Sequence, residues 1–332
     1  MASLWSSLNI TNISEFTLLG FPLGFQTKVV LFIVFLSVYL LTITSNVIII
    51  CLVKCNQQLH KPMYFFLANF SFLEIWYISV TVPKMLSDFL DQGRKISMVG
   101  CFIQFYFFFF FGSTENILLV IMSFDRYIAI CYPLQYFIIM TERLCRLLAV
   151  GAWITSVIAM MIVIIPVSRL SFCGSNDIDH VFCDFSPLVK LSCSGTKMSE
   201  VTFFFLAGVV MIGCFSLIMA SYVHIIMTVI ATSSTTGLRS ALTTCTSHFT
   251  VVFIYYGTVM FMYLRPSATI SFSIDKVVSV FYAVLTPLMN PIIYSLRNKE
   301  VKKAMQRSLR DSMKCFQTVK KPQTCLAFHY KQ

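Results

Sequence analysis

Residues 122–131 read MSFDRYIAIC and place an acid, Asp125, directly beside an arginine, Arg126, at the end of a long apolar segment. An ionisable pair at the edge of a bilayer is costly to keep there, so the default interpretation is a functional salt bridge that can open. The competing interpretation is a solvated charge pair just beyond the end of a helix. The rest of the chain favours the first.

The composition indicates an integral membrane protein. Of the 332 residues, 57% are hydrophobic and 12% are charged, and the mean hydropathy is +0.79, which is more apolar surface than a water-soluble core can hold. Seven stretches can each supply the roughly 20 residues that a membrane-spanning helix needs. The predicted spans are about 29–53, 62–83, 101–126, 147–168, 201–230, 240–264 and 277–296. They predict an all-α protein whose seven-helix transmembrane domain covers 29–296.

The distribution of lysine and arginine predicts the orientation of the chain in the membrane. The tail at 297–332 holds ten Lys or Arg residues against two acids, so the positive-inside rule makes it cytoplasmic. Seven spans then put residues 1–28 outside, where Asn9 and Asn12 begin glycosylation acceptor triplets. No cleavable signal peptide is evident before the first span. Orientation and anionic membrane lipid explain the basic tail, so we expect no nucleic-acid partner.

The cysteines divide by this topology. Cys101, Cys173, Cys183 and Cys193 fall on the outer side, where disulfides persist, and the other eight lie in helices or face the cytoplasm. Four outer cysteines permit three pairings, and the sequence does not choose among them. A zinc site is the competing use, but only His180 accompanies them near ligand spacing. We therefore predict no zinc site.

One face of the third span mixes aromatic residues with small and polar ones. At helical spacing it carries Phe105, Phe108, Phe109, Gly112, Ser113 and Asn116. A stripe of phenylalanine more often packs or faces lipid than binds a ligand. The small and polar members favour the interior, because polar groups that face lipid are costly.

Glu74 and Glu115 are the acids well inside the apolar stretches. At matched depth they can share a proton or hold a cation such as Na⁺, since two close carboxylates do not both ionise cheaply. The alternative is a pair of neutral, hydrogen-bonded acids that tie two helices together. The sequence leaves both interpretations open.

The last span ends in PLMNPIIY at 287–294. Pro291 removes a helical hydrogen bond and Asn290 can bond to the freed backbone groups, so we predict a hinge here. Apolar and basic residues then alternate in helical rhythm over 301–310, which predicts a short amphipathic helix on the inner leaflet. Enzyme motifs are absent from the sequence, so we expect neither an enzyme nor a cofactor beyond the candidate Na⁺.

Five motifs in the expected order resemble those of the odorant receptors, a branch of the rhodopsin-like G-protein-coupled receptors. They are LHKPMYFFL at 59–67, DRY at 125–127, SY at 221–222, TCTSH at 244–248 and PLMNPIIYSLRN at 287–298. The resemblance covers nearly all of residues 9–310. Glu74 departs from the family, in which aspartate is commoner at this position.

The resemblance implies roles for particular residues. It implies disulfides from Cys101 to Cys183 and from Cys173 to Cys193. The implied activation residues are Asp125, Arg126, Tyr127, Tyr222, Asn290, Pro291 and Tyr294. The implied ligand pocket is formed by Phe105, Phe108, Phe109, Gly112, Ser113, Val209, Val210, Tyr256, Val259, Met260, Tyr263, Val280 and Ala283.

The resemblance also implies a function at the plasma membrane. The receptor would bind small, largely apolar odorants and activate the olfactory stimulatory G protein, which raises cyclic AMP. Phe108 stands where amine receptors place an acid, so a neutral ligand is expected. Two alternatives remain: a rhodopsin-like receptor for a non-odorant, lipid-like ligand, and a transporter or channel that uses Glu74 and Glu115.

Overall fold

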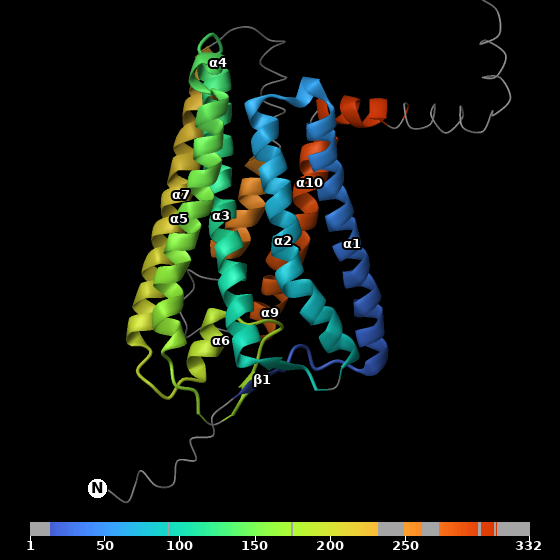
Figure 1. Cartoon of the computed structure of the whole chain (residues 1–332), viewed down its shortest axis with the longest axis vertical. Coiled ribbons are helices and arrows are strands. Elements are labelled where there is room, and N and C mark those ends of the chain that lie inside the picture. Colours follow the sequence, from blue (N-terminus) through green and yellow to red (C-terminus); the bar gives the residue numbers. More distant parts are fainter. Residues whose placement is uncertain are drawn as a thin grey trace, which may run out of the picture.

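The protein is a bundle of long, nearly parallel helices (Figure 1). The computed structural model describes residues 14–91, 93–173, 175–231, 249–260, 272–297, 300–308 and 310. The membrane-length helices are α1 (Phe25–Cys55), α2 (Pro62–Leu90), α3 (Met98–Cys131), α5 (Glu142–Ser168), α7 (Lys197–Ala231) and a last helix that begins with α9 (Phe272–Val280). A shorter apolar helix, Phe249–Met260, lies within the predicted sixth span.

Local sequence explains where several helices begin. Pro62 opens α2, where its missing N–H is not needed. The Ser97 hydroxyl accepts a hydrogen bond from the backbone N–H of Gly100 and caps α3, and Thr141 caps α5 through the N–H of Leu144. These caps satisfy donors that the first helical turn leaves unpaired.

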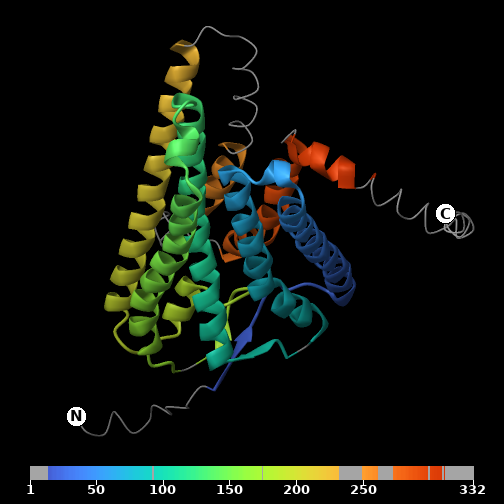
Figure 2. The ribbon, with the colours of Figure 1, turned by 45° about the horizontal axis from the view of Figure 1, so that its top comes forward.

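Burial places α3 at the centre of the bundle. In its most apolar window 61% of the residues are buried, against 17% for α1. Helix α3 packs against α2, α5 and α7, so one helix touches most of the bundle. The view in Figure 2 agrees, with α1 at the periphery. Side chains on the inner face of α3 therefore pack against several neighbouring helices.

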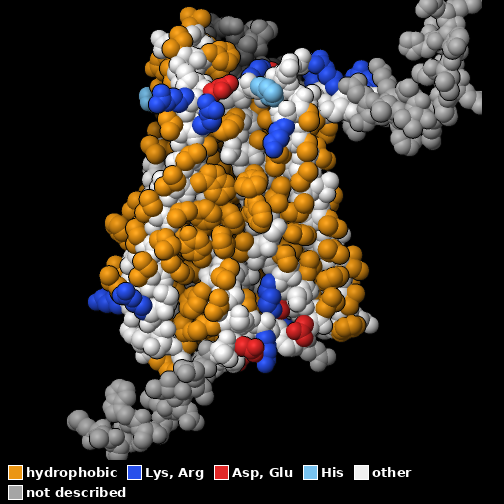
Figure 3. Space-filling model, in the orientation of Figure 1, with side chains coloured by type: hydrophobic (Ala, Val, Ile, Leu, Met, Phe, Trp, Pro, Cys, Tyr) orange, Lys and Arg blue, Asp and Glu red, His pale blue; other side chains and the backbone are white. Residues whose placement is uncertain are grey.

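The outside of the bundle suits a lipid bilayer. Figure 3 shows a broad band of hydrophobic side chains on one face, with most charged side chains toward its two ends. Large exposed residues such as Val30, Ile154 and Phe205 contribute to the apolar surface. Such exposure would be unfavourable in water but matches the hydrocarbon layer.

A small sheet and a short helix close the outer end. Strand β1 (Glu15–Leu18) lies between β2 (Lys95–Ser97), which is antiparallel to it, and β3 (Asp177–Ile178), which is parallel. Helix α6 (Phe185–Lys190) follows β3. Phe16 and Leu18 point inward from β1 and are almost fully buried. The N-terminal segment is thus joined to the first and second outer loops.

Short helices occupy the opposite, cytoplasmic end. They are η1 (Gln57–Leu59), α4 (Tyr136–Ile139) and a helix at 300–308, where the sequence predicts the amphipathic helix. In the last long helix a π-helical turn, η3 (Phe281–Leu285), connects α9 to α10 (Thr286–Arg297). Helix α10 continues through Pro291, and the π-helical turn lies closer to the outer side than the hinge expected at that proline.

Candidate functional site

A cavity lies in the outer half of the bundle, next to α3. It encloses about 680 Å³ of empty space, part of it open to the surroundings. Six helices contribute to its wall. The described lining residues are Tyr77, Phe108, Phe109, Gly112, Ser113, Asn116, Ala159, Met160, Val163, Phe203, Leu206, Ala207, Val210, Met211, Tyr255, Val259 and Tyr282.

Aromatic rings form much of the wall. Phe108 stacks on Tyr77 with ring centroids 5.2 Å apart, and it lies 5.8 Å from Tyr282. Phe109 meets Phe203 edge-on at 5.1 Å. A Cβ atom at Gly112 would lie 3.9 Å from the Tyr77 ring, an ordinary van der Waals contact. The cavity therefore suits a small apolar molecule.

One side of the cavity is polar. The Asn116 amide nitrogen donates to the Gly112 carbonyl oxygen at 2.8 Å and to the Tyr255 hydroxyl at 2.7 Å. That hydroxyl donates in turn to the Gly112 carbonyl at 3.1 Å. The Asn116 carbonyl oxygen and the Ser113 hydroxyl are buried and have no hydrogen-bond partner among the described residues.

The second outer loop covers the cavity. We call residues 177–190 the outer lid. Phe182 of the lid lies 4.7 Å from Phe108, and Phe185 stacks on Phe203 at 3.9 Å. Both lid rings are buried. The lid thus continues the aromatic wall of the cavity across its outer end.

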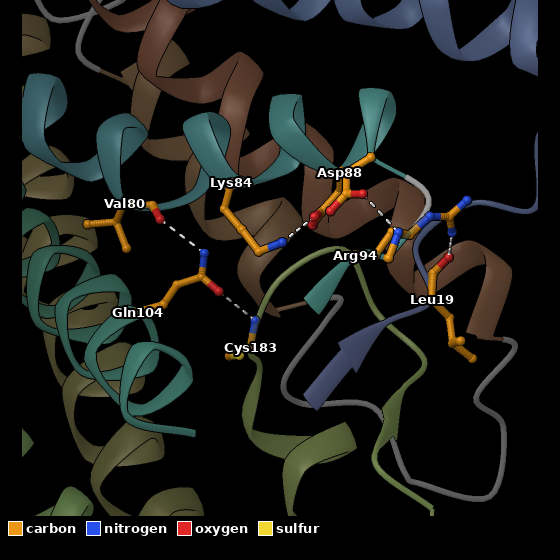
Figure 4. A network of polar contacts seen from close by, with 9 residues as sticks. Leu19, Val80, Lys84, Asp88, Arg94, Gln104 and Cys183 are labelled. Atoms are coloured by element: carbon orange, nitrogen blue, oxygen red, sulfur yellow. Dashed lines mark hydrogen bonds and ion pairs between the residues drawn. The ribbon is translucent and has the colours of Figure 1, made fainter. Parts of the chain in front are cut away.

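Covalent and polar links hold the lid in place. Disulfides join Cys101 to Cys183 and Cys173 to Cys193, the two pairs that the resemblance implies. Gln104 of α3 donates to the Val80 carbonyl oxygen of α2 at 3.0 Å and accepts from the Cys183 backbone N–H at 2.9 Å, as Figure 4 shows. One side chain therefore connects two helices to the lid.

Further contacts tie the lid to the last helix. The Lys276 ammonium bonds to Asp179 at 2.5 Å and to the Gly20 carbonyl oxygen at 2.9 Å. His180 lies 3.2 Å from the Ser279 hydroxyl. Burial lowers the pKa of His180 from 6.5 to about 4, so the ring is neutral at pH 7. Among the described residues, the Lys276–Asp179 ion pair and the His180–Ser279 hydrogen bond therefore join the lid to α9.

The inner end of α3 carries the Asp125–Arg126 pair in a closed state. The Arg126 Nε donates to the Asp125 carboxylate at 3.1 Å, and the Tyr136 hydroxyl of α4 donates to its other oxygen at 2.7 Å. Asp125 is fully buried. Nearby, the Tyr222 ring of α7 meets Phe249 edge-on at 5.4 Å.

The two core acids lie between α2, α3 and α10. Glu74 accepts a hydrogen bond from the Asn290 amide. Its second oxygen, and both oxygens of Glu115, are buried without a partner of suitable geometry among the described residues. Unpaired buried oxygens of this kind fit either a shared proton or a small cation.

Several predicted pocket residues line the cavity and others do not. Lining residues are Phe108, Phe109, Gly112, Ser113, Val210 and Val259. The described lining does not include Phe105, Val209, Tyr256, Met260, Val280 or Ala283. Tyr263, Asn9, Asn12 and the side chain of Tyr294 lie outside the described part of the chain.

Comparisons with known proteins identify the family. A family model described as "Olfactory receptor" matches residues 35–312. The chain is 48% identical to mouse (Mus musculus) olfactory receptor 6B9 over 301 residues, which is 91% of this chain and 95% of that protein. It is 49% identical to human (Homo sapiens) olfactory receptor 6A2 over 297 residues, covering 88% and 91%. The chain belongs to the olfactory receptor family.

The receptor also has the rhodopsin fold. It matches squid rhodopsin with a TM-score of 0.70 over 88% of this chain and 83% of that one, at 17% identity. This receptor is therefore a rhodopsin-like seven-helix protein that crosses the plasma membrane several times, and it is not an enzyme.

Sequence reasoning missed some of the receptor's cavity residues. Tyr255 lines the cavity and its neighbour Tyr256 does not, a difference of one residue in helical phase. Tyr282 lines the cavity, whereas Val280 and Ala283 do not belong to its described lining. Tyr282 lies in the π-helical turn Phe281–Leu285, where the helical phase differs from that of a regular α-helix. No signal marks Ala159 or Met160, which are ordinary apolar residues of a spanning helix.

Proposed function

We propose that the receptor binds small, largely apolar, neutral odorants in the cavity beside α3 and then activates the olfactory stimulatory G protein, which raises cyclic AMP. The cavity is the observation that carries this proposal. Its described lining contains no acid or base, so nothing there would balance the charge of an ammonium or carboxylate ligand. Aromatic walls supply the apolar contact that a small odorant needs.

The cytoplasmic end supports coupling to a protein partner. Leu134, Phe137 and Ile138 lie in or beside α4 and are 94%, 70% and 76% exposed. Figure 1 shows α4 at the end of the bundle opposite β1. Apolar side chains exposed beside the Asp125–Arg126 pair suit a docking surface for a G protein.

The proposed mechanism is an equilibrium between two states. A bound odorant stabilises an arrangement in which the inner end of the sixth span moves outward. Arg126 then leaves Asp125 and faces the G protein, while Tyr222 and Tyr294 move in behind it. The closed pair described above corresponds to the resting state.

The test is a cyclic AMP assay in cells that express the receptor with an accessory trafficking partner. A broad panel of neutral odorants is applied to the wild type and to Arg126→Ala, with surface delivery measured for both. We expect odorant responses in the wild type and their loss in the variant. Unchanged responses in Arg126→Ala would contradict the role of that residue.

Two other results would favour the alternative functions. Responses to lipid-like ligands alone would indicate a receptor for a non-odorant molecule. Substrate flux that is independent of odorant and unaffected by Arg126→Ala would indicate a transporter or channel based on Glu74 and Glu115.

We also propose that Glu74 and Glu115 hold Na⁺ or share a proton in the resting state. Their unpaired buried oxygens support this, since a cation would offset the repulsion between two carboxylates. If Na⁺ binds there, replacing external Na⁺ with choline should shift odorant potency in the wild type but not in Glu115→Gln. Equal potency in both salts would leave the shared proton as the remaining form of the proposal.

A further inference from the structure

Within the described part of the chain, two residues of the cavity lining that lie one helical turn apart each carry a buried polar atom without a hydrogen-bond partner. These atoms are the Ser113 hydroxyl and the Asn116 carbonyl oxygen. Asn116 as a whole is 4% exposed, and both residues line the cavity. A buried polar atom without a partner is costly, so a bound molecule that satisfies it gains affinity.

The neighbours of Asn116 determine which end of its amide remains unpaired. The amide nitrogen lies 2.8 Å from the Gly112 carbonyl oxygen, which can only accept a hydrogen bond. Exchanging the amide nitrogen and oxygen would place one acceptor against another at this distance. The Tyr255 hydroxyl also uses its hydrogen for the Gly112 carbonyl. The Asn116 carbonyl oxygen is therefore the unpaired end.

This orientation fixes the chemistry that the polar side of the cavity requires. The Asn116 carbonyl oxygen accepts hydrogen bonds and cannot donate them, so its partner must be a donor. The Ser113 hydroxyl can do either. A ligand hydroxyl meets both requirements, because it donates one hydrogen and accepts another. Ethers, esters, ketones and aldehydes have no such hydrogen.

We infer that the cavity prefers small neutral alcohols and phenols to carbonyl compounds and ethers of the same size. This inference rests on the proposed function and adds the ligand class. Asn116 and Ser113 are the residues that determine the preference. A ligand without a donor leaves the buried acceptor unpaired and so binds more weakly. This gives stronger selectivity between ligands than a difference in ligand size alone.

The experiment compares ligands in matched pairs. Aliphatic and aromatic alcohols are tested against methyl ethers and ketones of equal heavy-atom number, with cyclic AMP as the readout and surface delivery measured. We expect the half-maximal concentration for an active alcohol to be at least about tenfold below that of its ether or ketone. Equal potency within the pairs would overturn this inference and leave the proposed function standing.

Variants locate the source of the preference. Asn116→Leu removes the acceptor, and the alcohol-to-ether potency ratio should fall toward one. Ser113→Ala keeps the Asn116 contacts with Gly112 and Tyr255, and should reduce the ratio partly. Thr114→Val is the matched control, because the Thr114 hydroxyl bonds to the Phe110 carbonyl at 2.9 Å and Thr114 does not belong to the described lining.

The variants give outcomes that can be told apart. An unchanged ratio in both Asn116→Leu and Ser113→Ala would overturn the inference, as would a ratio that falls equally in Thr114→Val. If Asn116→Leu is not delivered to the surface, the potency ratio in Ser113→Ala alone tests the inference, and an unchanged ratio in that variant would overturn it. Silence of a well-delivered wild type toward every odorant would contradict the proposed function itself, and this inference with it.

Discussion

At the scale of single residues, Asp125 determines the resting state of the inner face. It is fully buried and accepts hydrogen bonds from two sides, the Arg126 guanidinium and the Tyr136 hydroxyl. A hydrogen bond to a charged group contributes about 1.5–3 kcal/mol net. The Tyr136 contact joins α4 to α3 in the closed arrangement, and we expect it to stabilise the closed pair.

Removing this hydroxyl should raise basal signalling. In Tyr136→Phe, the loss of about 1.4 kcal/mol would shift the equilibrium about tenfold toward the open state. The measurement is the cyclic AMP level in the absence of odorant, normalised to the amount of receptor at the cell surface. Tyr132→Phe is the control, since Tyr132 lies nearby but its hydroxyl only meets that of Tyr127 at 3.5 Å. Basal activity that is equal in the two variants would refute the role of Tyr136.

His180 should make the receptor sensitive to acid. Its environment contains Lys276 on α9, the lid acids Asp179 and Asp184, and the Ser279 hydroxyl. Burial lowers its pKa from 6.5 to about 4, so the unfolded chain binds the proton first. The contribution of His180 to the free energy of unfolding is therefore fully present above about pH 6.5. It is lost as the pH falls toward 4, by about 3 kcal/mol at most.

Thermal unfolding of purified receptor between pH 7.5 and 4.5 tests this. His180→Gln should lose less stability on acidification than the wild type, because glutamine binds no proton in either state. His60→Gln, which removes an exposed histidine on the inner side, is the control. Parallel curves for wild type and His180→Gln would show that His180 does not cause the acid sensitivity.

At the scale of elements, the first inner loop holds the helix at 300–308. Lys61 pairs with Glu300 at 2.9 Å, and the Tyr64 hydroxyl donates to the same carboxylate at 2.9 Å. Arg307 donates to Gln58 at 2.8 Å. Partial burial alone would raise the pKa of Glu300, but the hydrogen bonds from Lys61 and Tyr64 outweigh it and lower that pKa.

Reversing one charge should disturb this junction modestly. Glu300→Lys places like charges together, and we expect a lower maximal cyclic AMP response with unchanged odorant potency. The pair is about half exposed, so its effect on stability should be below about 1 kcal/mol. The double variant Lys61→Glu/Glu300→Lys should recover the response. No recovery would mean that the pair does not act through its charges.

At the scale of the whole molecule, α3 links the two ends of the receptor. Its outer end is bonded through Cys101 to Cys183 of the lid, its middle forms the cavity wall and its inner end carries Arg126. A ligand that changes the packing of this one helix therefore acts on both the lid and the G-protein face.

Breaking the outer disulfide should prevent folding and delivery. Cys101→Ser releases a loop closed over 82 residues, and such bonds typically contribute 2–5 kcal/mol in small secreted domains. We expect little surface receptor by antibody labelling, and no further loss in Cys101→Ser/Cys183→Ser. Cys51→Ser, at an exposed free cysteine of α1, is the control. Normal delivery of Cys101→Ser would contradict this prediction.

The sequence alone determined the membrane class, the seven-helix fold and the family, and it predicts the orientation. These properties are local, since apolar length, charge distribution and short motifs can be read without knowing which segments touch. The stripe on α3 was also readable, because helical spacing puts Phe108, Gly112, Ser113 and Asn116 on one side.

Only the tertiary structure decided which of two adjacent residues, such as Tyr255 and Tyr256, lines the cavity. It also decided that the second outer loop covers the cavity. Helical phase gains about 100° per residue, so Tyr255 and Tyr256 cannot be told apart without their packing partners. Tyr282 lies inside a π-helical turn, which a regular helical pattern does not predict. The sheet joins segments far apart in the chain. The unpaired end of the Asn116 amide likewise depends on Tyr255, from a helix 139 residues away.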